Sequence, residues 1–152
     1  MLKPETAAGV TTIAAFETVE ADGYRVTAIP AVHSTKDPLN YVVQSKDRTL
    51  LYAADTGPYA DETLKFLGRY RFDCVISECT GGLGRIDYGT HLALSDVVRF
   101  KERMSEVKAS DAKTKWFLTH FSHSGAGSYA ELAKAARRSG MTVACDGLKV
   151  RI

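Results

Sequence analysis

The sequence has 152 residues, of which 45% are hydrophobic and 25% charged, and its formal net charge is +2. This length suits one domain with a buried core, and the composition excludes a disordered or fibrous chain. The small net charge gives no electrostatic support for a nucleic-acid partner, although it does not exclude one. No stretch has the apolar length of a membrane span, and no signal peptide is recognisable, so we expect a cytoplasmic protein without membrane contact. The three cysteines (Cys74, Cys79 and Cys145) form no Cys-x-x-Cys motif and are expected to be reduced thiols.

The first part of the chain is predicted to form strands. Alternating apolar residues flank the turn dipeptide Asp22-Gly23, and a polar loop at 45–48 separates two further apolar runs. The expected strands are Thr11–Thr18, Tyr24–Val32, Tyr41–Gln44 and Thr49–Ala54.

The remainder alternates between helical and strand patterns. Ser128 can cap a helix that runs to Arg138 and ends at Gly140. The other expected elements are helices Ala60–Tyr70 and Leu92–Met104, strands Asp73–Ser77 and Trp116–Thr119, a glycine-rich loop Thr80–Gly89, and a final strand pair Met141–Cys145 and Leu148–Ile152 around Asp146-Gly147. This order predicts an α/β fold with one mixed sheet covered by helices.

Three predicted strands are each followed directly by a histidine or an aspartate. His33 follows the second strand, Asp55 the fourth, and His120 ends the apolar run in WFLTHFSHS. In α/β sheets, residues at the carboxyl ends of strands line the ligand crevice. Because imidazole and carboxylate are the usual ligands of zinc, manganese and iron, the joint pattern predicts a metal site.

Each of these residues, taken alone, also has a structural interpretation. A histidine after a strand is commonly only hydrogen-bonded, and Asp55 before Thr-Gly could form an Asx turn or cap the next helix. His91 precedes a predicted helix and is either a turn residue or a general acid/base. Glu78 and Cys79 stand at a further strand end, and Cys79 is interpreted as structural.

Several loop residues are candidates for contact with an anionic substrate. They are Ser122, Tyr88 and Arg85, and His123 is either a substrate contact or a partner of a metal ligand. The glycine-rich segment at 81–84 lacks both the spacing of a dinucleotide site and the lysine of a P-loop.

Five segments together resemble one family. The series AIPAVHS, LLYAADTG, GTHLAL, WFLTHFSHS and MTVACDGLKV is similar to the C-terminal half of metallo-β-lactamase-fold hydrolases. The likeness is greatest to the phosphodiesterase branch, which includes phosphoribosyl 1,2-cyclic phosphate phosphodiesterase and, more distantly, ribonuclease Z. It extends from Tyr24 to the C-terminus.

The resemblance implies a fold, a metal site and a reaction. Residues 1–152 would form one partial domain, the C-terminal βα half of an αββα sandwich. His33, Asp55 and His120 would be metal ligands, with Asp55 bridging two metals, and His91 would be the acid/base. The implied cofactor is a divalent metal, zinc or manganese. The implied reaction is hydrolysis of a small phosphorylated substrate, such as a cyclic phosphodiester, by metal-bound hydroxide.

One family motif is absent. His-x-His-x-Asp-His, which supplies further ligands in the first half of the fold, does not occur in this sequence. One hypothesis is therefore a metal-dependent hydrolase, and an alternative is a catalytically incomplete half-domain that needs an N-terminal partner half or associates with itself. A third is a small α/β binding module without metal. The half-domain hypothesis predicts an exposed apolar sheet face and concentration-dependent association.

Overall fold

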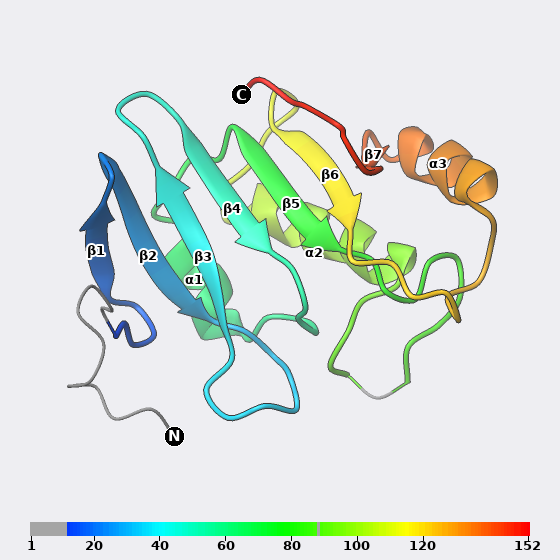
Figure 1. The fold of residues 1–152 in the computed structure, drawn as a ribbon, viewed down its shortest axis with the longest axis horizontal. Coiled ribbons are helices and arrows are strands. Elements are labelled where there is room, and N and C mark those ends of the chain that lie inside the picture. The colour runs from blue at the N-terminus through cyan, green and yellow to red at the C-terminus, as the bar shows by residue number, and fades with distance from the viewer. Residues whose placement is uncertain (1–11, 88) are drawn as a thin grey trace.

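A computed structural model of the protein describes residues 12–87 and 89–152, and it contains one seven-stranded sheet and three helices. The strands follow one another across the sheet in chain order (Figure 1). They are β1 (Thr18–Ala21), β2 (Tyr24–Pro30), β3 (Leu39–Gln44), β4 (Thr49–Ala53), β5 (Cys74–Glu78), β6 (Lys115–Thr119) and β7 (Thr142–Val143).

The sheet changes from antiparallel to parallel at β4. Strands β1 to β4 pair antiparallel, and β4 to β7 pair parallel. The first hairpin turns at Asp22 and Gly23, which have φ angles of 49° and 81°. Two successive positive φ angles are characteristic of the two-residue turn that matches strand twist, and Asp-Gly is a preferred sequence for it. The parallel strands need longer connections, which the helices supply.

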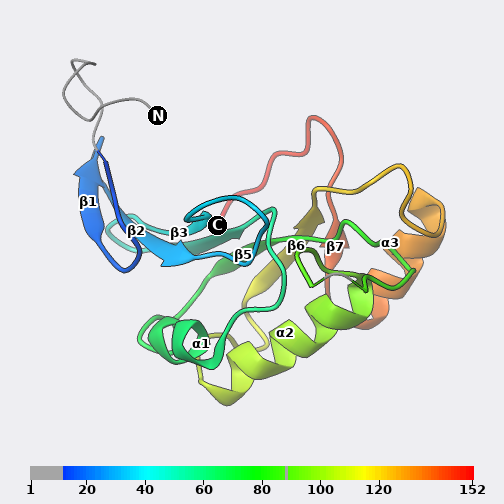
Figure 2. The same cartoon turned by 90° about the horizontal axis from the view of Figure 1, so that it is seen from below.

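Two helices cover one face of the sheet. Helices α1 (Asp61–Leu67) and α2 (Leu94–Glu106) lie on the same side, as Figure 2 shows, whereas α3 (Tyr129–Arg138) lies beside β7. Between sheet and helices is a core whose members are almost fully buried: Ile29, Val42, Leu51, Leu67, Val75, Val97, Met104, Trp116 and Leu118. The mixed α/β sheet with covering helices confirms the predicted fold class.

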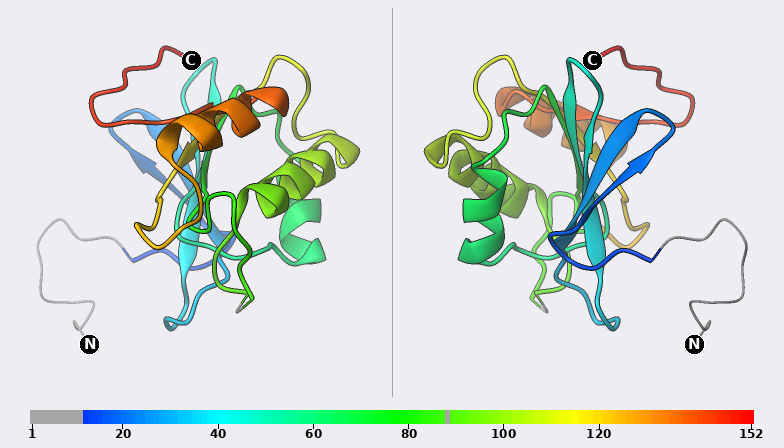
Figure 3. Two further views of the ribbon diagram at one scale, coloured as in Figure 1. Left: turned by 90° about the vertical axis from the view of Figure 1, so that its right-hand side faces the viewer. Right: turned by 90° about the vertical axis from the view of Figure 1, so that its left-hand side faces the viewer.

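The opposite face carries a second set of apolar side chains. Cross-strand pairing places them in two rows that run across the strands. One row consists of Val26, Val43, Leu50 and Cys74. The other consists of Ala28, Tyr41, Tyr52, Ile76 and Phe117. We call this surface the open face. Within the described residues no helix covers it (Figure 3). Tyr52 is 44% exposed, Ala28 and Cys74 are buried, and the other members are half-buried.

The predicted first strand is wrong in position. The structure begins β1 at Thr18, and residues 12–17 are not in a strand, while Thr11 lies outside the described residues. Phe16 has a φ angle of 67°, so the backbone turns there and extended structure starts only at Thr18, where pairing with Thr27 begins.

The predicted final hairpin is also wrong. A turn does form at 145–148, where the Leu148 N–H donates to the Cys145 carbonyl, but residues 148–152 form no strand. The preceding strand shrinks to β7, which pairs with β6 instead. Ile152 borders a cavity beside Val43 and Leu50 at one end of the open face. Leu148 and Val150 remain exposed, so the apolar alternation of this segment does not produce strand pairing.

Other element boundaries differ from the expected ones by a few residues. Helix α1 is shorter than Ala60–Tyr70 because the Arg69 and Tyr70 N–H groups bond three residues back, which ends the α-helical pattern. Helix α2 starts at Leu94 because its N-cap, Ala93, has an extended backbone and the Leu92 carbonyl accepts from the Gly81 N–H instead of from a helical donor. Ser128 caps α3 as predicted, accepting from the Glu131 N–H.

Within the described residues no helix is long and apolar enough to cross a bilayer. Cys74, Cys79 and Cys145 are free thiols, with the first two buried and Cys145 exposed. Burial raises the pKa of the Cys79 thiol to about 12, which fits its expected structural role.

Candidate metal centre

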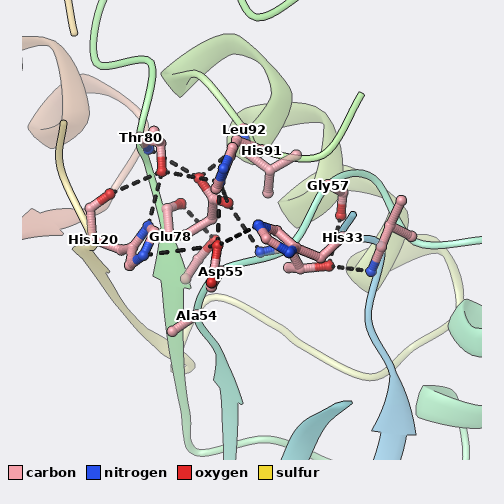
Figure 4. Close-up of polar contacts among 12 residues, drawn as sticks. His33, Ala54, Asp55, Gly57, Glu78, Thr80, His91, Leu92 and His120 are labelled. Atoms are coloured by element: carbon pink, nitrogen blue, oxygen red, sulfur yellow. Dashed lines mark hydrogen bonds and ion pairs between the residues drawn. The ribbon is translucent and has the colours of Figure 1, made fainter. Parts of the chain in front are cut away.

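The candidate site lies at the end of the sheet that is formed by the carboxyl ends of four strands. Asp55 and His120 follow β4 and β6, Glu78 is the last residue of β5, and His33 follows β2. Strand β2 runs in the same direction as β4, because each is antiparallel to β3 between them. Four segments distant in sequence thus deliver their side chains to one place (Figure 4).

Three histidines surround one oxygen of Asp55. From Asp55 Oδ1 the distances are 3.2 Å to His33 Nε2, 3.4 Å to His91 Nδ1 and 3.8 Å to His120 Nε2. Nitrogen and oxygen ligand atoms gathered this closely suit a borderline divalent cation such as zinc or manganese.

Asp55 and His120 share an unusual backbone conformation. Their φ angles are 57° and 56°, in the left-handed region that residues other than glycine rarely occupy. Such strained positions persist only where surrounding contacts fix them, and they cluster at functional sites. The turn after each strand therefore aims the side chain across the sheet edge.

Glu78 is the buried centre of the site, with a fully buried side chain. Its Oε1 accepts from the Thr56 N–H at 3.0 Å and from His91 Nδ1 at 2.8 Å. Its Oε2 accepts from the Thr80 and Leu92 N–H groups at 2.9 and 3.0 Å. Since each oxygen already has two donors, Glu78 acts as a support that ties the loops after β4 and β5 together.

Thr80 orients the ring of His120. Its hydroxyl donates to the His120 carbonyl at 3.0 Å and lies 2.9 Å from His120 Nδ1. Because the hydroxyl proton is used by the carbonyl, we infer that the oxygen accepts from Nδ1–H, which leaves the lone pair on Nε2. That nitrogen is the one directed at Asp55. A ligand histidine held through its other nitrogen is the usual arrangement at metal sites.

A buried polar chain supports the Asp55 turn from behind. Asn40 Nδ2 donates to the Ala54 carbonyl at 2.6 Å, and the Tyr59 hydroxyl donates to Asn40 Oδ1. Burial raises the pKa of Tyr59 far above its usual value, so the hydroxyl stays protonated as a donor. The Thr56 hydroxyl accepts from the Val32 N–H at 2.9 Å and so fixes the turn to the segment between β2 and His33.

The structure brings four of the predicted site residues together: His33, Asp55, His91 and His120. Asp55 does not cap a helix, since Ala60 is the N-cap of α1. His123 is exposed and makes no polar contact with the four among the described residues. The Ser122 hydroxyl is hydrogen-bonded to the Ser124 hydroxyl, and Tyr88 lies outside the described residues.

Sequence reasoning assigned no role to Glu78, Thr80, Asn40 or Tyr59. Glu78 has the same strand-end position as Asp55 and His120, and this pattern could have identified it. The other three have no recognisable sequence pattern, because their importance comes only from contacts between distant segments.

The donor set fits a divalent metal. One ligand atom from each of Asp55, Glu78, His91 and His120 lies within 4.8 Å of the others, and His33 Nε2 reaches Asp55 from the far side. With Glu78 occupied by its donors, and His91 Nδ1 bonded to Glu78, the atoms suited to a metal are those of Asp55, His33 and His120.

Three solved structures have the same fold and are similar to this chain over about half their own length. The metallo-beta-lactamase fold protein YhfI from Bacillus subtilis is 20% identical, with a TM-score of 0.68, and the match covers 87% of this chain and 51% of YhfI. A diphosphatase from the PhnP family is 22% identical, with a TM-score of 0.64 and coverage of 90% and 47%. Zn²⁺-bound PqqB from Methylobacterium extorquens is 18% identical, with a TM-score of 0.62 and coverage of 93% and 52%.

No curated protein sequence matches this chain significantly. The family model described as beta-lactamase superfamily domain matches residues 2–139, which is most of the sequence. This match and the shared fold confirm the resemblance carried by the strand-end histidines and aspartate. The chain therefore belongs to the beta-lactamase superfamily.

Proposed function

We propose that this chain carries the metal site of a phosphodiester hydrolase. The observation that supports the proposal most directly is the convergence of His33, His91 and His120 on Asp55 Oδ1 at the sheet edge. The similarity to a PhnP-family diphosphatase supports phosphorus-oxygen bond hydrolysis as the reaction class.

His33, Asp55 and His120 would hold the metal, zinc or manganese. A divalent metal at this position supplies an activated water at neutral pH and polarises a phosphoryl oxygen. Asp55 occupies the centre of the group, so its carboxylate fixes the relative position of the ligands.

His91 is proposed as the general acid for the leaving oxygen. Its Nδ1 bonds Glu78 Oε1 at 2.8 Å, which fixes the ring and keeps a proton on Nδ1. Proton donation to the leaving oxygen would then take place from Nε2 of the doubly protonated ring.

A second candidate is a half-domain that needs another half for activity. The open face with its exposed Tyr52 favours this candidate, because sheets with apolar residues on both faces are normally covered on both. The similar structures are also about twice as long as the part that matches this chain.

Metal content of the purified chain tests the proposal. After equilibration with zinc or manganese and removal of excess, we expect near-equimolar metal, measured by elemental analysis. His33→Ala and His120→Ala should lose the metal, because each removes a ligand atom near Asp55. His123→Ala is the matched control, since this histidine is exposed and outside the cluster.

Hydrolysis of bis(p-nitrophenyl) phosphate by the metal-loaded chain then separates the two candidates. Turnover that disappears in His91→Ala while metal stays bound supports the hydrolase. Bound metal without turnover supports the half-domain, and a chain that binds no metal refutes both the site and the mechanism.

A further inference from the structure

His33 lies in a loop that is largely exposed to solvent. The loop connects β2 to β3 over residues 31–38, and the residues that follow His33, 34–37, are exposed. A loop of this kind, held only at its base, would let a side chain take many positions, and fixing one of them costs conformational entropy. Yet His33 Nε2 lies 3.2 Å from Asp55 Oδ1 (Figure 4). Another part of the molecule must therefore hold this loop.

The residue before His33 is bonded on both sides of its backbone to the turn after β4. The Val32 N–H donates to the Thr56 hydroxyl at 2.9 Å, and the Gly57 N–H donates to the Val32 carbonyl at 2.7 Å. Within the described part of the chain, these are the hydrogen bonds that join the loop to another segment, apart from the ion pair of His33 itself. The position of the His33 ring therefore depends on how Val32 is held.

The Thr56 hydroxyl is oriented for this task. It donates to the Gly57 carbonyl at 3.1 Å, so a lone pair of its oxygen is directed at the Val32 N–H. Thr56 is fully buried, and its own N–H donates to Glu78 Oε1 at 3.0 Å. Thr56 thus connects the exposed loop of His33 to the buried support of the site.

We infer that Thr56 is a positioning residue for His33. Its hydroxyl fixes the Val32 peptide, and this peptide places the His33 ring beside Asp55. Without the hydroxyl the loop loses one of its two bonds to the Asp55 turn, and the unpaired Val32 N–H favours conformations in which water reaches it. This inference rests on the proposed function, to which it adds the residue that keeps one of the proposed metal ligands in place.

Zinc affinity of the full chain measures the effect on the site. Thr56→Val keeps the shape of the side chain but removes the hydroxyl. It should weaken zinc binding about 10–100-fold, which is the usual result of losing a group that orients a metal ligand. Thr56→Ser keeps the hydroxyl and should bind zinc as the parent chain does. Competition with a chromophoric chelator gives these affinities.

Thr114→Val is the matched control, at the opposite end of β6 from His120. The Thr114 hydroxyl also donates to a backbone carbonyl, that of Phe72, and accepts from a backbone N–H, that of Asp111. Thr114 is buried as Thr56 is. The control variant should lose stability for the same reason as Thr56→Val but keep its zinc affinity, which separates positioning from a general loss of stability.

Proton NMR of the metal-free chain tests the inference without a metal. The ring centroids of His33 and His91 are 5.2 Å apart in an edge-to-face arrangement, so protons of the two rings should show a nuclear Overhauser effect. Thr56→Val should lose this effect, whereas Thr56→Ser and Thr114→Val should keep it.

The His120 ring provides an internal reference in the same spectra. It should keep its chemical shifts in Thr56→Val, because the Thr80 hydroxyl still lies 2.9 Å from its Nδ1. Chemical shifts that move at both His33 and His120 would show a general loosening of the site and would overturn the inference.

The inference is also overturned if Thr56→Val keeps the parent's zinc affinity or its Overhauser effect, if the parent chain shows no such effect, or if Thr114→Val loses as much zinc affinity. The two measurements distinguish these results from a failure of the proposed function. A parent chain that binds no zinc but shows the Thr56-dependent Overhauser effect removes the metal site and keeps Thr56 as the residue that positions His33.

Discussion

Glu78 shows how one buried residue organises the site. It is fully buried, and each of its oxygens accepts two hydrogen bonds, from three backbone N–H groups and one imidazole. A buried carboxylate is costly unless its bonds are made, and here all are made. The residue therefore positions Thr56, Thr80 and His91 relative to one another.

Glu78→Gln is expected to destabilise the protein by about 3 kcal/mol or more, because hydrogen bonds to charged groups contribute ~1.5–3 kcal/mol each. The glutamine NH₂ group would replace one of the two carboxylate oxygens and would face two donors in either orientation. In one orientation these are the Thr56 N–H and His91, and in the other they are the Thr80 and Leu92 N–H groups. Urea unfolding measures the difference in free energy of unfolding.

Glu62→Gln is the control for that measurement, because Glu62 is exposed in the first turn of α1. If the two variants have the same stability, Glu78 is not the support that its contacts indicate.

At the scale of elements, α3 depends on a local capping arrangement. The Ser128 oxygen accepts from the Glu131 N–H at 3.3 Å, and Glu131 accepts from the Ser128 N–H at 2.9 Å and from its hydroxyl at 2.8 Å. These bonds lower the pKa of the Glu131 carboxyl below its ordinary value. Reciprocal bonds of this kind satisfy donors that the helix itself leaves unpaired.

The lowered pKa of Glu131 determines how the cap responds to pH. Because the folded state binds the proton less readily, the cap stabilises the protein above the ordinary glutamate pKa. This stabilisation is lost as the pH falls through the lowered folded pKa. Glu131→Gln should therefore be less stable than the parent chain at neutral pH, and the difference should shrink in acid.

Thermal unfolding at a series of pH values measures this effect, with Glu102→Gln, exposed in the middle of α2, as the control. A stability difference that is constant from neutral to acidic pH would show that the Glu131 carboxylate does not contribute to the cap.

At the scale of the whole molecule, the sheet has one covered and one open face. Pairing across β2 to β6 places Val43 next to Leu50 and Tyr52 next to Ile76 on the open face. Tyr52 is 44% exposed, and Tyr24, the first residue of β2, is 48% exposed. Val43, Leu50 and Ile76 beside them are half-buried. A contiguous, partly exposed apolar surface of this kind usually marks an interface.

We expect the chain to associate as its concentration rises, through the open face. Tyr52→Lys should shift the chain toward the monomer, because a charged side chain on this face opposes burial. Sedimentation velocity over a range of concentrations measures the effect. Leu83→Lys is the control, since Leu83 is 41% exposed but lies in the loop after β5. A parent chain that stays monomeric at every concentration contradicts this expectation.

The sequence by itself determined the fold class and three strand-end candidates. His33, Asp55 and His120 could be recognised because strand period and strand ends are local patterns, and parallel strands must bring their carboxyl ends to one edge. The Ser128 cap and the Asp22-Gly23 turn are local for the same reason.

Only the tertiary structure decided how these candidates are supported and where the chain leaves the sheet. The bonds from Thr56, His91 and Leu92 to Glu78 and the contact of Thr80 with His120 join segments that are far apart in sequence. The segment 148–152 alternates like a strand yet pairs with none, because alternation gives a preference for a surface but does not specify a partner. Such outcomes depend on which distant backbone groups meet, and this is determined only when the whole chain has packed.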